Sequence, residues 1–306
     1  MSQPFFSVIV PVYNRAHVLG EAVASVLAQT CQDFEIIVVD DGSKDDPAAA
    51  LMKFSDPRIR FIRQPNRGGG AARNAGIDAA RGRFVAPLDS DDRFLPGHLE
   101  RMKGLLEGTQ DTVGYARMVV DRGGGRTLLK PPRAIRPDEH MATYLLCDRG
   151  FVPTITVAVP AARARAVRYH EQLRFAEDTD FAIRLYLAGC SFVMAEEPGA
   201  VWKDLPDPGR SSAGRKGARL IPWLEQLKSQ IPPRAYHGGR GWVIAKGVAA
   251  TSKWQALKLY VTALLHGCYR PRLAAIVFLQ IFLPDRAYRA FADLAVAIMR
   301  PNVRPA

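Results

Sequence analysis

Apolar segments and helical segments alternate along the first third of the chain. The apolar segments are rich in Val, Ile and Phe without polar alternation, which predicts strands buried on both faces. These strands are predicted over 5–12, 34–39, 59–63 and 83–88. Apolar residues at helical spacing predict helices over 18–29, 46–54, 70–80 and 95–107. The alternation predicts an α/β fold with a mainly parallel sheet covered by helices on both faces.

Polar and charged side chains follow each of the four predicted strands. They are Tyr13-Asn14-Arg15, Asp40-Asp41-Gly42-Ser43, the segment 66–74 and Asp89-Ser90-Asp91-Asp92. Ligands of parallel α/β sheets bind at the carboxyl ends of the strands. Four polar strand ends at one edge of the sheet therefore predict a binding site there.

The fourth of these segments holds three carboxylates within four residues. Carboxylates that repel one another are usually gathered around a shared cation, and oxygen ligands suit Mg²⁺ or Mn²⁺ bound together with a substrate's phosphates. The alternative for this segment taken alone is an Asp-rich turn that caps the next helix.

The motifs PVYNR, VVDDGS, GGGAARNAGI and LDSDD, in this order and spacing, resemble the nucleotide-sugar half of glycosyltransferase family 2. The resemblance covers about residues 5–205. It implies a GT-A type fold, a nucleotide diphosphate sugar as donor, with a UDP-sugar expected, and inversion at the transferred sugar carbon.

The resemblance also implies roles for particular residues. Pro11 and Tyr13 would line the base pocket, and Asp40 or Asp41 would accept a hydrogen bond from the uracil imide, with Asp41 slightly preferred. Arg73 stands in the first turn of a helix opened by three glycines, where free N–H groups favour anions, and would contact the nucleotide. A solvated arginine is the alternative for this position.

For the DSDD segment, the resemblance implies that one carboxylate contacts the ribose or a metal-bound water and that another binds the cation. Asp91 and Asp92 are the main metal candidates, supported by Asp89, and Asp89 and Asp91 are assigned to the nucleotide-sugar. A Mn²⁺ or Mg²⁺ ion would neutralise charge on the departing diphosphate.

A predicted helix begins with an acidic first turn that contains Glu177, Asp178 and Asp180. These acids could simply complement the helix dipole. In the family that the motifs resemble, an ED pair at such a helix supplies the general base, and its aspartate matches Asp178. Removing a proton from an acceptor hydroxyl requires one ionised carboxylate within hydrogen-bond reach.

One feature departs from the family pattern. Many relatives have a histidine after the last strand, whereas this chain has Val201-Trp202-Lys203-Asp204 and then an Arg- and Ser-containing segment. Lys203 or Arg210 is the candidate for neutralising the diphosphate instead, and an ordinary loop is the alternative.

The net charge of +12 lies entirely in the C-terminal third of the chain. Residues 215–306 contain 15 Lys and Arg against 3 Asp and Glu, while residues 1–214 are balanced at 27 of each. The sequence therefore predicts a catalytic domain over 1–214 and a basic helical C-terminal region over 215–306. Such a region favours an anionic surface, either a membrane or a nucleic acid.

Two apolar stripes with helical spacing occur in this basic region. One is formed by Trp254, Leu257, Val261, Leu264 and Leu265, and the other by Tyr288, Phe291, Ala295, Ile298 and Met299. The apolar run 273–283 between them is shorter than the about 20 residues of a membrane span. The helices could pack on the catalytic domain or bind an anionic membrane peripherally.

The leading hypothesis is a glycosyltransferase that builds cell-surface polysaccharide on a glycan or lipid-linked acceptor. The chain shows no secretory signal and no paired cysteine motif, so a cytoplasmic location, peripheral on the inner face of the cytoplasmic membrane, is expected. A sugar nucleotidyltransferase of similar fold is one alternative, although such enzymes carry a glycine-rich basic loop where this chain has Tyr13-Asn14-Arg15. A nucleic-acid binder is the other, but no recognition motif is present and no nucleic acid is expected as a partner.

Overall fold

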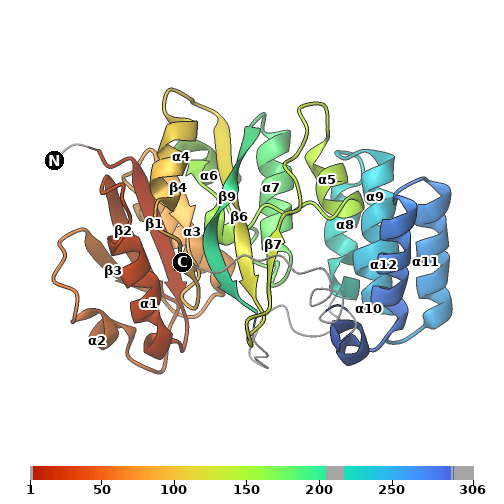
Figure 1. The fold of residues 1–306 in the computed structure, drawn as a ribbon, viewed down its shortest axis with the longest axis horizontal. Helices are drawn as coiled ribbons and strands as arrows, with labels where there is room; N and C mark the ends of the chain where they lie inside the picture. Colours follow the sequence, from red (N-terminus) through yellow and green to blue (C-terminus); the bar gives the residue numbers. More distant parts are fainter. Residues whose placement is uncertain (1–2, 205–216, 291, 293–306) are drawn as a thin grey trace. The chain divides into compact units, whose positions relative to one another are not determined.

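The computed structural model describes residues 3–204, 217–290 and 292 (Figure 1). The chain forms two compact units that are interleaved along the sequence. The first contains residues 1–123, 129–134 and 152–204, and the second contains 124–128, 135–151 and 205–306. The predicted boundary between 214 and 215 falls in the segment 205–216, which lies outside the described residues.

A five-stranded sheet in the first unit confirms the predicted α/β class. It consists of β1 (Phe6–Val12), β2 (Phe34–Asp40), β3 (Ile59–Arg63), β4 (Phe84–Pro87) and β8 (Val159–Pro160). The order is β3-β2-β1-β4-β8, and all pairs are parallel except that of β4 with β8. The residues of β2 are all buried, as expected for a strand with helices on both sides.

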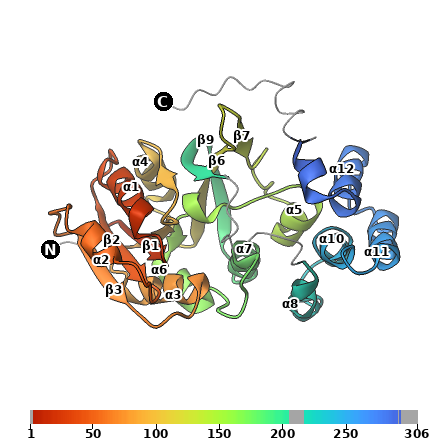
Figure 2. The same cartoon turned by 90° about the horizontal axis from the view of Figure 1, so that it is seen from below.

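The strand order places the connecting helices on opposite faces. The chain steps outward from β1 to β2 and β3, then returns across β1 to reach β4. Because such crossovers are right-handed, α1 (Ala16–Leu27) and α2 (Pro47–Leu51) cover one face and α3 (Gly69–Ala79) covers the other. Figure 2 shows α1 and α3 on opposite sides of the sheet. The order reverses between β1 and β4, and ligands of such folds bind at this switch point.

A second, four-stranded sheet has the order β5-β9-β6-β7. Its strands are β5 (Arg93–Phe94), β6 (Thr112–Asp121), β7 (Thr127–Lys130) and β9 (Ser191–Lys203), and the helices of this part are α4 (His98–Leu106), α6 (Ala161–Val167) and α7 (Glu177–Leu187). The helix predicted over 95–107 begins only at His98, because the chain first forms β5 and then turns at Gly97 with a φ of +75°. The DSDD segment therefore does not cap this helix, and the helix-capping alternative is wrong.

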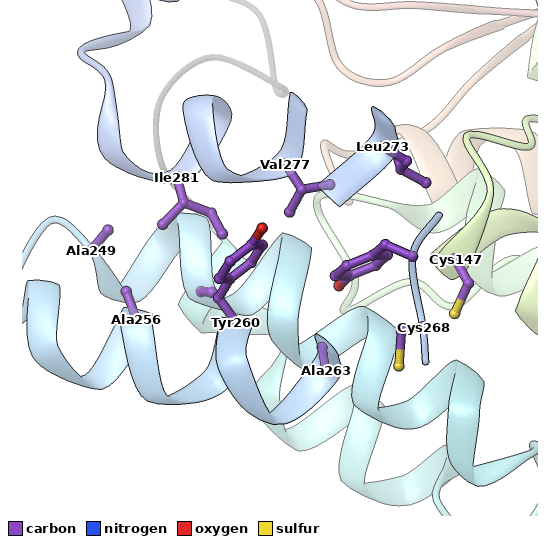
Figure 3. Packing of buried hydrophobic residues seen from close by; sticks show 11 residues of the cluster. Cys147, Ala249, Ala256, Tyr260, Ala263, Cys268, Leu273, Val277 and Ile281 are labelled. Atoms are coloured by element: carbon purple, nitrogen blue, oxygen red, sulfur yellow. The ribbon is translucent and has the colours of Figure 1, made fainter. Parts of the chain in front are cut away.

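The second unit is helical. Its elements are α5 (Met141–Cys147), α8 (Ile221–Leu227), α9 (Pro233–Gly239), a π-helical turn (Arg240–Ile244), α10 (Ala245–Val248), α11 (Lys253–Leu265) and α12 (Pro271–Phe282). Figure 3 shows its core, in which side chains of α11 meet Val277 and Ile281 of α12. No helix in the described ranges is both long enough and apolar enough to cross a membrane.

The apolar stripe predicted on α11 is not the face that packs in this core. Ala256, Tyr260 and Ala263 are buried in the cluster, whereas most of the predicted stripe is exposed. The physical reason is close helix packing: a Cβ added to Gly241 would collide with the Ala263 side chain, so small residues let the backbones approach. In the second predicted stripe only Tyr288 is described, and its other members lie outside the described residues.

Candidate active site

An ion pair spans the switch point between β1 and β4. The Arg15 guanidinium, in the loop after β1, pairs with the Asp91 carboxylate in the loop after β4, and both side chains are partly exposed. Tyr13 is exposed beside Arg15, and Pro11 is partly buried at the end of β1. The loops after two neighbouring strands thus present charged and aromatic groups at the edge where the sequence predicted a site.

The loops after β1 and β2 are joined by hydrogen bonds. Asn14 donates its backbone N–H to Ser43 Oγ at 3.0 Å and accepts the Lys44 N–H at 2.8 Å through Oδ1. Asp40 is fully buried, and its Oδ1 accepts the Ser43 N–H at 2.8 Å. Its Oδ2 lies 3.3 Å from Arg63 Nε, an ion pair without hydrogen-bond geometry. Asp40 therefore shapes the turn that follows β2.

The Asp41 carboxylate holds the glycine-rich loop after β3. It accepts three hydrogen bonds, from Gln64 Nε2 at 2.8 Å, from the Arg67 N–H at 2.9 Å and from the Gly68 N–H at 2.7 Å. Gly68 has a φ of +95°, and a Cβ there would collide with the Arg174 guanidinium. The loop thus requires glycine at this position, and Asp41 fixes its backbone before α3 begins.

Arg73 connects the two acidic motifs of the site. Its guanidinium is buried, donates to Asp89 Oδ1 at 2.6 Å through Nη2, and donates to Glu177 Oε1 at 3.4 Å through Nη1. Burial opposes the charge, but the two carboxylates outweigh it and raise the pKa of Arg73. The solvated-arginine alternative is wrong, because this side chain is a buried bridge between the β4 loop and the start of α7.

Each carboxylate of the DSDD segment has a different neighbour. Asp89 pairs with Arg73, Asp91 pairs with Arg15, and buried Asp92 accepts the backbone N–H of Lys203 at 3.0 Å. Asp92 therefore ties the β4 loop to the end of β9, while Asp91 keeps a partly exposed carboxylate at the edge of the sheet.

An oxygen-only donor set at Asp91 fits Mg²⁺ or Mn²⁺. Within the described ranges, no group of three or more His, Cys, Asp or Glu side chains could hold an ion. A cation at this edge would therefore need oxygen atoms from a bound diphosphate, as Mg²⁺ in nucleotide sites usually does.

The three acids that open α7 also differ in their partners. Glu177 pairs with Arg73, and buried Asp180 accepts from Arg184 Nε at 2.9 Å. Asp178 forms no ion pair with any described residue, and its Oδ1 accepts the Thr179 N–H at 2.7 Å. The ion pair with Arg184 gives Asp180 a structural partner, whereas Asp178 accepts an N–H of the first helical turn and pairs with no cation among the described residues.

The surroundings of Asp178 favour its neutral form. Burial and the neighbouring Glu177 carboxylate raise the pKa of Asp178 to about 6, against opposing effects of the Thr179 N–H and Arg73. Asp178 lines a small cavity together with apolar side chains that include Phe181 and Leu185 of α7. Tyr169 lines the same cavity and stacks on Phe181 with ring centroids 4.1 Å apart. A carboxyl group with a pKa near neutrality is what a general base requires.

The Tyr169 hydroxyl is buried and forms no hydrogen bond with the described residues. Tyr169 and Arg15 are not among the site residues predicted from the sequence. Arg15 stands inside the PVYNR motif, which was a usable signal, whereas no motif marks Tyr169. Of the candidates for neutralising a diphosphate, Lys203 forms an ion pair with Glu21, and Arg210 lies outside the described residues.

Comparisons with known proteins show the family to which the chain is similar. The family model "Glycosyl transferase family 2" matches residues 7–174. The amylovoran biosynthesis glycosyltransferase AmsB of Erwinia amylovora is 28% identical over 239 residues, which are 75% of this chain and 79% of that protein.

Solved structures of other proteins have a similar fold. S. aureus TarS 1–349 in complex with UDP-GlcNAc is similar with a TM-score of 0.59 and 19% identity, over 95% of this chain and 90% of that one. The mannosyltransferase PcManGT of Pyrobaculum calidifontis, in complex with GDP-Man and Mn²⁺, has a TM-score of 0.60 and 17% identity, over 98% and 87%. This likeness confirms the predicted GT-A type of fold. Since the family model covers more than half of the sequence, the chain belongs to glycosyltransferase family 2.

Proposed function

We propose that the protein is an inverting glycosyltransferase that moves a sugar from a UDP-sugar to an acceptor hydroxyl. The observation that carries this proposal is the contrast among the first-turn acids of α7. Glu177 and Asp180 have cationic partners, while Asp178 pairs with no cation among the described residues and has a pKa raised to about 6. The UDP-GlcNAc bound by the similar TarS structure supports the choice of donor.

In this reaction the donor binds at the switch point between β1 and β4. Pro11 and Tyr13 flank the base, and Asp40 or Asp41 accepts the imide N–H of uracil. Both carboxylates accept hydrogen bonds from backbone N–H groups of the neighbouring loops. These hydrogen bonds would orient the carboxylate that contacts the base. Asp89 contacts the ribose side and is held in place by Arg73. Arg73 acts on the nucleotide through Asp89, because its own guanidinium is buried between two carboxylates.

Asp178 takes the proton of the acceptor hydroxyl as that oxygen attacks the anomeric carbon from the face opposite the diphosphate. The attack forms the new glycosidic bond while the bond from the anomeric carbon to the diphosphate oxygen breaks. One such displacement inverts the configuration, and no covalent enzyme intermediate forms. The hydrogen bond from the Thr179 N–H fixes one Asp178 oxygen and leaves the other for the acceptor.

A divalent cation, Mn²⁺ or Mg²⁺, belongs to this proposal. Asp91 would bind it from the exposed edge of the β4 loop, and Asp92 would support it while tying that loop to β9. When bound, the cation would neutralise charge on the departing diphosphate. The Mn²⁺ in the similar mannosyltransferase structure supports metal use.

We further propose that the acceptor is a glycan or lipid-linked glycan in cell-surface polysaccharide synthesis, at the inner face of the cytoplasmic membrane. The name of AmsB, an amylovoran biosynthesis glycosyltransferase, supports the acceptor class. The net positive charge of the chain lies within residues 215–306, and this supports an anionic membrane surface as the place where the enzyme acts.

Calorimetric titration with UDP, in Mn²⁺ and in EDTA, tests the donor and the metal together. UDP should bind at least tenfold more tightly in Mn²⁺, because Asp91 and its neighbours otherwise repel the diphosphate. Asp91→Asn should remove this dependence, whereas the exposed control Asp138→Asn should keep it. Equal affinity in Mn²⁺ and EDTA would reject the metal assignment, and absence of UDP binding in both would reject the donor.

A further inference from the structure

Helix α11 presents an apolar surface on its outer side. Trp254 is 66% exposed, Val261 41%, Leu264 38% and Leu265 83%. Their spacing of seven, ten and eleven residues from Trp254 places them on adjacent sides of one helix. We call these four side chains the α11 surface.

The α11 surface is distinct from the face that stabilises the fold. The opposite face packs Ala256, Tyr260 and Ala263 into the core of the helical unit, and the Tyr260 hydroxyl donates to the Ala274 carbonyl at 2.9 Å (Figure 3). Helix α11 is therefore apolar on two sides, although only one side has a partner among the described residues. Two Leu, one Val and one Trp on a surface helix form a patch of the kind that binds a partner or a membrane.

The Lys and Arg side chains of helix α11 and of the turn that follows it are accompanied by no Asp or Glu in that segment. Helix α11 contains Lys253 and Lys258 and no acidic residue, and exposed Arg270 and Arg272 follow it closely. Lys258 Nζ lies 5.8 Å from the centroid of the Trp254 ring. An apolar strip with Trp and basic residues beside it matches the boundary between the headgroups and acyl chains of an anionic bilayer.

We propose that the α11 surface inserts into the interfacial layer of an anionic membrane, with helix α11 lying parallel to the bilayer. The thirteen residues of α11 give a helix about 20 Å long, which suits a flat orientation and not a transmembrane one. This proposal rests on the membrane location proposed above and identifies the residues that produce it.

The chemistry of the surface argues against two other occupants. A symmetric contact between two copies would place Lys253 and Lys258 of both chains in one interface without any acidic residue of α11 to pair with them, because a two-fold interface uses one patch twice. A nucleic acid would accept the positive charge but leave the aliphatic side chains of Leu264 and Leu265 in water. Anionic lipid is the partner that satisfies the apolar and the basic side chains together.

Co-sedimentation of the full-length protein with vesicles tests the proposal. Vesicles of phosphatidylcholine with about a third phosphatidylglycerol should bind the protein at least tenfold more tightly than pure phosphatidylcholine, and binding should weaken as salt rises. The double variant W254S/L265S should lose at least tenfold in binding. Both side chains are exposed, so the substitutions leave the core intact. Met52→Ser, at a position 82% exposed in the first unit, is the matched control and should bind as the wild type does.

Charge reversal separates a specific surface from general attraction. K253E/K258E should change the logarithm of the vesicle affinity by more than twice the change caused by the single control Lys228→Glu, which replaces an exposed lysine in the same basic region. Trp254→Phe should keep binding but lose most of the blue shift in tryptophan fluorescence that vesicles cause. Wild-type binding by W254S/L265S would overturn the proposal, and so would a wild-type dimer that this variant abolishes, because a second copy would then cover the surface.

The test does not depend on the transfer chemistry. UDP affinity in W254S/L265S should equal that of the wild type, because no α11 residue belongs to the proposed donor site. Loss of vesicle binding with normal UDP binding supports the α11 surface even if the acceptor proves different. Normal vesicle binding in an inactive Asp178→Asn variant would show that location and catalysis are independent.

Discussion

Asp178→Asn should abolish sugar transfer and at the same time make the folded protein more stable at neutral pH. Loss of a general base costs about 10²–10⁴-fold in rate. The stability gain follows from the pKa of Asp178, which burial and Glu177 raise from 3.8 to about 6. Replacing a carboxylate that stabilises the fold would lower the free energy of unfolding instead. Loss of activity together with a gain in stability therefore distinguishes a catalytic carboxylate from a stabilising one.

The size and sign of the stability effect follow from proton linkage. An acid whose pKa is raised on folding binds its proton more tightly in the folded state, so its ionisation destabilises that state. The shift from 3.8 to about 6 corresponds to about 3 kcal/mol at most, fully expressed above pH about 6 and absent below pH about 4. An amide carries no charge, and its oxygen can still accept the Thr179 N–H. The variant should therefore gain stability at pH 8 and match the wild type near pH 4.

Urea unfolding at pH 8 and pH 4, followed by circular dichroism, measures this difference. Asp180→Asn is the matched control, because Asp180 lies in the same turn of α7 but is buried against Arg184. Breaking that buried pair should cost about 3 kcal/mol or more at pH 8. If Asp178→Asn were destabilised at pH 8 as Asp180→Asn is, Asp178 would be a structural acid and the proposed base would have to lie elsewhere. Near-wild-type turnover would refute the assignment independently.

Two further substitutions test the electrostatics and the loops of the site. Glu177→Gln removes the neighbouring negative charge, so the pKa of Asp178 should fall. The acidic limb of kcat/KM, expected at pH about 6 in the wild type, should then move to lower pH, and an unmoved limb would mean that another group controls it. Asp41→Asn should lower the free energy of unfolding by about 1–3 kcal/mol, because an amide cannot accept all three N–H groups that the carboxylate holds. A denaturation midpoint equal to that of the wild type would contradict this role for Asp41.

The first sheet could be predicted closely because its signal is local. A parallel strand covered on both faces must be apolar throughout, and four such segments predicted β1–β4 with ends that differ by at most one residue. The carboxyl ends of these strands then predicted where a site should lie, without any knowledge of tertiary contacts. The later start of α4 was missed, since a two-residue strand such as β5 has no periodicity to detect.

The inward face of α11 could not be predicted because helical periodicity reveals a stripe and not its partner. The large apolar residues of α11 formed the obvious stripe, but close packing against Gly241 selected the small face with Ala256 and Ala263. Burial of the larger face would bring more apolar area out of water. Its exposure in the described structure is therefore the feature that points to a partner outside the chain.

The connection between the two acidic motifs was also beyond the reach of local patterns. Arg73, Asp89 and Glu177 come from three separate segments, and no spacing relates them. The single buried guanidinium pairs with both carboxylates and ties the β4 loop to α7, but it balances only one of their two negative charges. Asp178 consequently keeps a negatively charged neighbour without acquiring a cation of its own. Burial, together with the charge of Glu177, gives Asp178 the raised pKa that its proposed role as the general base requires.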